Sequence, residues 1–192
     1  MKKTYTETIE SSNRKQAFEL LARMEEEYER KNAAFFNKVL MEEPSLVVRV
    51  HAVTVLSEIG DDSSVSVLAD VMKNDPSSLI RHEAAFSLGQ LGLGGAVPFL
   101  IDSTLRDSSE IVRHEAAAAL GGIGDERARK TLERACKDAS EEVRGSALAS
   151  LFNLDYLKFA GQRKQDAEQL AVSIQEKRKR AESQKTKRMP HP

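Results

Sequence analysis

The chain has 192 residues, of which 40% are hydrophobic and 31% are charged, and its net charge is -1 at neutral pH. This length suits one domain, and the hydrophobic fraction is enough to build a continuous core. The composition excludes collagen-like, low-complexity and disulfide-scaffold proteins. No apolar run approaches the roughly 18 to 20 residues of a membrane span, so a soluble chain with no membrane segment is expected.

The N-terminal segment, residues 1–44, is predicted to cap the fold. Lys2 and Lys3 are followed by polar residues instead of an apolar stretch, which predicts no secretory signal and a cytoplasmic location. Residues 12–41 are interpreted as one or two helices ahead of Pro44 that seal the first edge of the repeats. Their apolar anchors are expected to be Phe18, Leu20, Leu21, Phe35, Phe36, Val39 and Leu40.

Residues 45–157 contain an internal repeat with a period of 31 or 32 residues. Each unit begins with an amphipathic pattern whose apolar residues recur at three and four residues, and a glycine turn leads into a second apolar pattern. Four such helical hairpins cannot bury their apolar faces singly, so an all-α solenoid (superhelix) is predicted. The repeat is visible at Arg49, Arg81, Arg113 and Arg144, at Leu56, Leu88, Leu120 and Leu151, and at Gly60, Gly92 and Gly124.

The C-terminal segment is predicted to be a helix over 158–182 followed by a disordered tail over 183–192. The helix carries a narrow apolar stripe suited to docking on the last repeat or on a partner, formed by Ala167, Leu170, Ala171 and Ile174. Residues 161–192 are basic, with 9 Lys+Arg against 4 Asp+Glu, whereas residues 45–160 are acidic, with 12 against 17. An acidic centre argues against nucleic acid as the main partner.

Three further features are interpreted as structural. The lone Cys136 lies in a helical pattern that predicts a small buried thiol. The arginine series is expected to pair between repeats with acids such as Asp75 or Asp107. The glycines do not form a dinucleotide-binding fingerprint, because Val97 stands where the third glycine is needed, and they are expected to be turn residues: Gly89, Gly92, Gly94 and Gly95.

The strongest chemical signal is a repeated dipeptide, His82-Glu83 and His114-Glu115, which recurs 32 residues apart at the same register. Neither occurrence has a second histidine four residues later, as a zincin helix would. Equivalent positions on stacked helices lie about 8–10 Å apart, so two imidazoles can converge on one ion. Two histidines and one carboxylate favour non-heme Fe(II) with open positions for O2. A metal site at His82, Glu83, His114 and Glu115 is therefore predicted.

A competing interpretation needs no metal. The helix dipole favours Glu in a first turn, so each dipeptide can be a solvated pair inherited from duplication of the repeat. The outer repeats carry Val50-His51 and Gly145-Ser146 at this register, so duplication alone did not fill every unit. His51 is interpreted as an exposed or satisfied helix residue, with a pocket residue beside the site as the alternative.

The repeats resemble short HEAT-like repeats of the kind first associated with phycobilisome lyases. Residues 81–90 and 112–124 further resemble the paired His-Glu repeats of deoxyhypusine hydroxylase, a HEAT-like di-iron monooxygenase whose two similar halves each supply two such motifs. The resemblance implies that His82, His114 and Glu115 bind iron. It also implies that Glu83 is a ligand, a group supporting a ligand, or a substrate contact.

Residues 45–157 resemble only one half of that enzyme, and a C2 homodimer would restore the four motifs. The expected protein is thus a homodimeric non-heme di-iron protein, with about one iron per chain, that binds or activates O2. It would act as a monooxygenase on a protein or small-molecule substrate, or as an O2 carrier or sensor. The alternative is a metal-free HEAT-like adaptor or lyase-type accessory subunit that grips another protein.

Overall fold

The computed structural model describes residues 5–187, with side chains at 16 and 18–175, and every regular element in that range is a helix. This confirms the predicted all-α solenoid. The α-helices are α1 (Tyr5–Glu29), α2 (Ala33–Glu42), α3 (Leu46–Ile59), α4 (Asp62–Asn74), α5 (Ser78–Leu91), α6 (Val97–Arg106), α7 (Glu110–Ile123), α8 (Arg129–Ala135) and α9 (Glu141–Lys187). Two short 3-10 helices, η1 (Gly94–Ala96) and η2 (Glu126–Ala128), precede α6 and α8.

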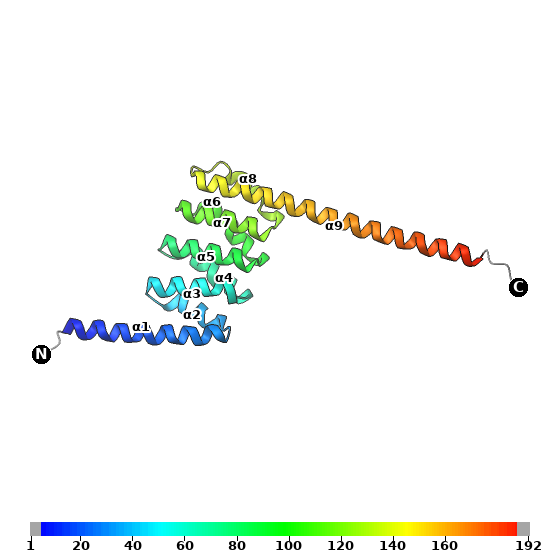
Figure 1. Cartoon of the computed structure of the whole chain (residues 1–192). Coiled ribbons are helices and arrows are strands. Elements are labelled where there is room, and N and C mark those ends of the chain that lie inside the picture. The colour runs from blue at the N-terminus through cyan, green and yellow to red at the C-terminus, as the bar shows by residue number, and fades with distance from the viewer. Residues whose placement is uncertain (1–4, 188–192) are drawn as a thin grey trace.

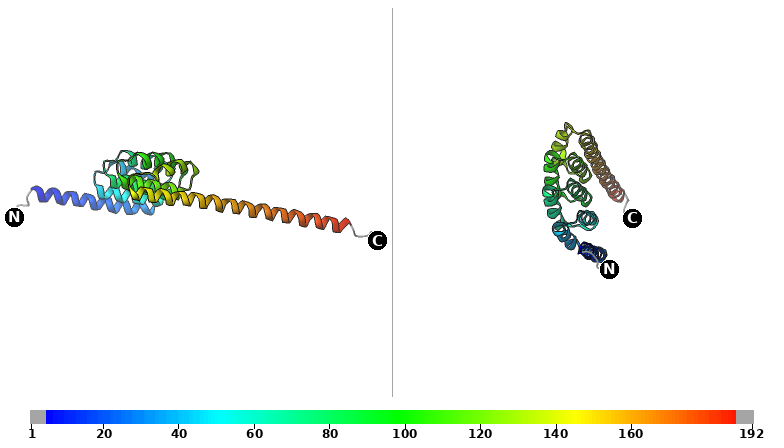
Figure 2. Two further views of the ribbon diagram at one scale, coloured as in Figure 1. Left: turned by 90° about the horizontal axis from the view of Figure 1, so that it is seen from above. Right: turned by 90° about the vertical axis from the view of Figure 1, so that its left-hand side faces the viewer.

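The helices stack in two layers (Figure 1). One layer contains α1, α3, α5, α7 and α9, and the other contains α2, α4, α6 and α8 (Figure 2). The stack is curved, and the layer with α5 and α7 lies on the inside of the curve (Figure 2, right). This inner layer carries both His-Glu dipeptides.

Local sequence explains where the hairpins turn. The side chain of Asp61 accepts hydrogen bonds from the backbone N–H groups of Ser63 (2.9 Å) and Ser64 (3.3 Å), which completes a capping box at the start of α4. Gly92 and Gly124 end α5 and α7 in the left-handed region, with φ of 65° and 73°. Glycine suits both positions because it has no Cβ to clash there.

An arginine-aspartate ladder joins successive hairpins. Arg81 donates two hydrogen bonds to the Asp107 carboxylate, at 2.8 and 2.9 Å, and Arg113 does the same to Asp138. Arg49 pairs with Asp75 in the repeat before. The recurring arginines are therefore architectural, as expected. Each ion pair joins the two helices of one hairpin, and Arg81 and Arg113 also donate to the carbonyl oxygens of Asp75 and Asp107 at the end of the hairpin before.

Small residues let the inner helices approach each other closely. Ala84, Ala85, Ala116 and Ala117 are fully buried between neighbouring hairpins. A Cβ added at Gly89 would lie 2.8 Å from the Ala119 Cβ, and one added at Gly121 would lie 2.8 Å from the Ser150 Cα. The backbones at these two contacts leave no room for a side chain.

Gly121→Ala is expected to lower the free energy of unfolding by about 1–2 kcal/mol, because the new methyl group must push α7 and α9 apart. The matched control is Gly122→Ala on the same helix, where nothing lies within 4 Å of an added Cβ. That control should be neutral, or stabilising by up to about 1 kcal/mol, because alanine favours helix. Urea unfolding followed by far-UV circular dichroism compares the two, and equal effects would contradict the close contact.

The N-terminal helices match the predicted cap only in part. Met24, Phe36 and Leu40 are fully buried, or nearly so, and Phe35 packs against the core. Phe18 is 72% exposed instead of serving as an anchor, and Leu21 is also exposed. Cys136, expected to be buried, is half-buried, because it lies at the C-terminal end of α8.

The last repeat departs most from expectation. Instead of a hairpin followed by a separate helix at 158–182, α9 runs without interruption from Glu141 to Lys187 and leaves the stack (Figures 1 and 2). The sequence between 155 and 187 has no proline and a single glycine, Gly161, so it contains no turn that would fold the chain back onto the stack. The helix includes 183–187 of the predicted tail, and the rest of that tail lies outside the described residues. None of the described helices is both long and apolar enough to cross a bilayer.

Candidate metal centre

The first turns of α5 and α7 position the predicted site. Ile80 and Val112 are fully buried and fix the rotation of each helix about its axis. The next residues, His82-Glu83 and His114-Glu115, are consequently half-exposed on the inner layer. The same register on both helices places the two dipeptides on neighbouring rungs of the solenoid.

His82 lies between two carboxylates. Its Nε2 atom is 3.3 Å from Oε2 of Glu115 on α7, and its Nδ1 atom is 3.4 Å from Oε1 of Glu83. The Nδ1 atom is buried but has no hydrogen-bond partner among the described residues. A buried ring nitrogen without a partner normally costs free energy, so this atom has unused donor or acceptor capacity.

The carboxylates also change the titration of His82. The hydrogen bond to Glu115 is the largest influence and raises the pKa of His82 above its ordinary value, and the negative charges of Glu115 and Glu83 act in the same direction. Partial burial of the ring opposes this rise. The imidazole is therefore held in a locally negative environment, which also favours a bound cation.

His114 faces a different partner. Its Nδ1 atom lies 2.7 Å from Oγ of Ser146 and 3.3 Å from the backbone carbonyl oxygen of Glu142, both on α9. Each histidine thus contacts the residue at the glutamate position of the next repeat. This residue is Glu115 for His82 and Ser146 for His114. The structure brings together His82, Glu83 and Glu115 but does not turn the two imidazoles toward one common point as the sequence predicted.

The donor types fit a transition metal even though the ligands are not assembled. No group of three or more His, Cys, Asp or Glu side chains is arranged to hold a metal among the residues described. However, an unpartnered imidazole nitrogen and two carboxylates are neighbours at His82, and His114 occupies the next rung. Imidazole and carboxylate are ligands that suit non-heme iron. His82, Glu83, Glu115 and His114 are the residues that would hold it.

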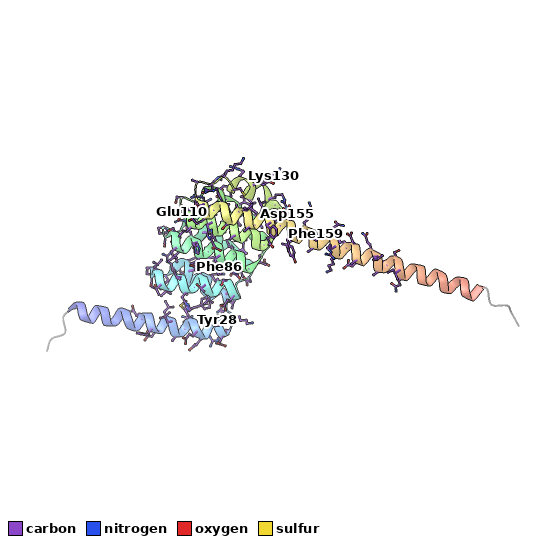
Figure 3. All side chains as sticks on the ribbon, turned by 45° about the horizontal axis from the view of Figure 1, so that its top comes forward. Tyr28, Phe86, Glu110, Lys130, Asp155 and Phe159 are labelled. Atoms are coloured by element: carbon purple, nitrogen blue, oxygen red, sulfur yellow. The ribbon has the colours of Figure 1, made fainter. Side chains whose placement is uncertain are left out.

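Exposed apolar side chains flank this site. Leu79 and Ile111 occupy equivalent positions one turn before the dipeptides, and Phe86 follows on α5 (Figure 3). All three are exposed on the inner layer. A polar cluster framed by exposed apolar side chains is typical of a binding or contact surface.

Comparisons with known proteins agree with this architecture. A family model described as HEAT repeats matches the chain at residues 10–89, 33–119 and 97–161. The chain belongs to the HEAT-repeat family. No curated protein matches its sequence.

Among solved structures, this HEAT-repeat chain is similar to human deoxyhypusine hydroxylase, determined in complex with glycerol. The two share 29% sequence identity with a TM-score of 0.62, over 73% of this chain and 48% of the human protein. The HEAT-repeat chain therefore spans about half the length of that enzyme.

Sequence reasoning did not find a second polar cluster on the inner layer of the HEAT repeats. The Tyr28 hydroxyl donates a 2.7 Å hydrogen bond to Glu58, and this bond is the main reason that the pKa of Tyr28 is raised. His51 is exposed, as expected, and lines a recess of about 260 Å³ beside this pair. Only the three-dimensional stacking of α1 on α3 brings Tyr28 and Glu58 together, because 30 residues separate them in the chain.

A larger groove of about 800 Å³ lies between α4 and α6, on the other layer of the HEAT repeats. Its lining mixes apolar and charged side chains, including Phe99, Asp70, Lys73 and Arg106. None of the four predicted metal-binding residues lines this groove, so the groove is separate from the His82 site.

Proposed function

We propose that this HEAT-repeat protein binds iron through His82, Glu83, His114 and Glu115, and that two copies of the chain assemble a di-iron site that binds or activates O2. The observation that carries the proposal is His82, whose buried Nδ1 atom lacks a hydrogen-bond partner while carboxylates approach both ring nitrogens. The likeness to human deoxyhypusine hydroxylase supports iron, because that enzyme uses a di-iron centre.

The chain's own residues divide the work as follows. His82 and Glu115, which come from adjacent hairpins and already lie in contact, would hold the metal, and Glu83 and His114 would complete the set of donors. His114 would have to give up its contact with Ser146 to bind the metal. Iron with open coordination positions supplies the chemistry of O2 binding and reduction. Leu79, Phe86 and Ile111 would exclude water once a second copy covers the site.

The half-length relation supports the dimer. The matched part of the chain covers 48% of the human enzyme, so the matched parts of two copies would together cover about its full length and would supply four His-Glu dipeptides. In a C2 dimer the same surface faces its own copy, which places the two sites around the symmetry axis. A symmetric pair presents two identical surfaces to a substrate. We therefore propose O2 binding or activation and leave both a monooxygenase and an O2 carrier or sensor within the proposal.

The test is the iron content of the full chain, produced with added iron and purified in air. We expect about one iron per chain together with an absorption band in the visible region that changes when O2 is removed. An iron content near zero in iron-supplied protein that is otherwise folded would overturn the proposal.

One observation favours a second function, that of a metal-free adaptor or lyase-type accessory subunit. The groove between α4 and α6 is open, mixed in charge and lined by neither dipeptide, as a peptide-gripping surface of a solenoid would be. An adaptor would show no iron and would keep its fold and its assembly state in a chelator.

A further inference from the structure

The terminal helix α9 carries a stripe of exposed apolar side chains, and one of them, Phe159, has the Arg163 guanidinium 6.0 Å from its ring centroid. Phe152 is 74% exposed and Leu148 is 66% exposed, and both lie beside the last repeat. The stripe continues past the repeats, where α9 projects alone and carries Phe159 (Figure 3). Its members share one side of the helix in two groups, Leu148 to Phe159 and Leu170 to Ile174, and the charged residues Arg163 and Asp166 lie on that side between the groups. Each apolar member is at least 45% exposed: Leu148, Phe152, Tyr156, Phe159, Leu170 and Ile174.

The stripe lies on the side of α9 opposite to α7. Ser150 and Asn153 donate hydrogen bonds to the carbonyl oxygens of Ala117 and Gly121 on α7, at 2.9 and 2.8 Å. These residues mark the side of α9 that packs on the stack. Leu148 and Phe152 stand about half a helical turn away from them and therefore face outward along the solenoid axis.

Equivalent positions in the earlier repeats show which residues normally occupy this outward face. Leu148 is equivalent to Ala117 and Ala85, which are fully buried against the next hairpin. Phe152 is equivalent to Gly121 and Gly89, where the next helix packs on the backbone itself. The last rung thus presents large apolar side chains where the inner rungs present small ones.

Such a terminal face normally needs polar residues, because the end of a solenoid meets water. The three aromatic side chains each bury about 150–250 Å² when fully covered, and all are more than half exposed. Covering them on two chains removes roughly 600–900 Å² from water, and the aliphatic members bring the total toward the approximately 1,200 Å² of a stable interface.

We propose that α9 pairs with the α9 of a second copy of this chain through the stripe formed by Leu148, Phe152, Tyr156, Phe159, Leu170 and Ile174. A second copy matches the stripe because it offers an equally long, straight and apolar helix, and a two-fold axis lets the same face cover itself. The seam extends along about 26 residues, or roughly 39 Å of helix. It lies away from the His82 surface, so this pairing goes beyond the proposed iron function and requires no metal.

The experiment measures the mass of the full chain in solution, without metal and in the presence of chelator, by light scattering coupled to gel filtration. The wild-type chain should have the mass of two copies, while Phe152→Glu and Leu170→Glu should each halve it. The matched control is Val172→Glu, which changes an equally exposed apolar residue, at 56%, on the opposite side of the same helix. Its mass should stay that of two copies.

Far-UV circular dichroism verifies that each variant remains helical. A wild-type chain with the mass of one copy would overturn the pairing. The pairing would also be overturned if Val172→Glu dissociated the chains as readily as Leu170→Glu, or if neither stripe variant changed the mass.

Iron loading separates this inference from the proposed function. Phe152→Glu chains, single without metal, should pair when iron is added, because the di-iron proposal uses the other surface. If the Phe152→Glu chains did not pair on iron loading, the result would count against the di-iron assembly but not against the pairing through α9. In the wild type, use of both surfaces would join more than two copies.

Discussion

Arg81→Ala is expected to lower the free energy of unfolding by about 3 kcal/mol, which corresponds to a melting temperature roughly 6–12 °C lower. The Arg81 and Asp107 side chains are only 11% and 7% exposed, and two hydrogen bonds join them. Removing the guanidinium leaves a buried carboxylate without its counter-charge. It also removes the bond from Arg81 to the Asp75 carbonyl oxygen, so two hairpin connections weaken together.

The control for this variant is Arg106→Ala, which breaks an ion pair with Asp102 on the surface of α6, where the Arg106 side chain is 77% exposed. Exposed pairs contribute little, so the expected loss is at most about 0.5 kcal/mol. Thermal unfolding followed by circular dichroism at neutral pH compares the two variants. Similar losses in both would contradict the structural role of the ladder.

The ladder also predicts a dependence on pH. Burial by itself would raise the pKa of Asp107, but the hydrogen bonds from Arg81 and from the Ser109 backbone N–H outweigh it and hold that pKa below its ordinary value. The pair therefore stabilises the fold above the unfolded-state pKa of about 3.9, and this contribution is lost as the pH falls through the lower folded-state pKa. The difference in the free energy of unfolding between the wild type and Arg81→Ala should accordingly become smaller in acid.

If the proposed site binds iron, His82→Ala is expected to weaken iron binding by more than about 100-fold, because the site would lose the proposed ligand that lies between two carboxylates. Glu115→Gln should weaken binding by about 10–100-fold, since it keeps the size of the side chain but removes the negative charge beside the His82 Nε2 atom. Competition with a coloured chelator during anaerobic titration measures both affinities.

The matched control is His51→Ala. His51 is an exposed histidine on the same layer that lines the recess beside Tyr28, and among the described residues no hydrogen bond or ion pair joins it to either dipeptide. Iron affinity in this variant should equal that of the wild type. If His51→Ala lost iron as completely as His82→Ala, the metal would have to be placed elsewhere.

Much of the architecture could be predicted from the sequence because the solenoid repeats its local rules. The 31- or 32-residue spacing of arginine, leucine and glycine fixed both the hairpin and its stacking, and the pairing of Arg81 with Asp107 follows from the same register. One glycine was assigned wrongly: Gly89, expected to be a turn residue, lies inside α5, where its lack of a side chain allows the close contact with Ala119.

The site was harder to predict because it depends on side-chain direction. Periodicity placed His82 and His114 on neighbouring rungs, but each ring contacts the following repeat, so Glu115 and Ser146 became the partners. The length of α9 was also missed. The repeat pattern led to the expectation of a separate helix over 158–182, whereas the sequence offers no turn before it. Its exposed stripe was foreseen only in part, at Leu170 and Ile174.

The most direct test of the account is electron paramagnetic resonance of the fully oxidised, iron-loaded chain at a known iron content. Two ferric ions held together by a pair of chains couple to a state without a net spin, so the iron should give almost no signal. A signal from isolated high-spin ferric ions that accounts for all the iron would show that the metal ions do not meet and would contradict a di-iron site.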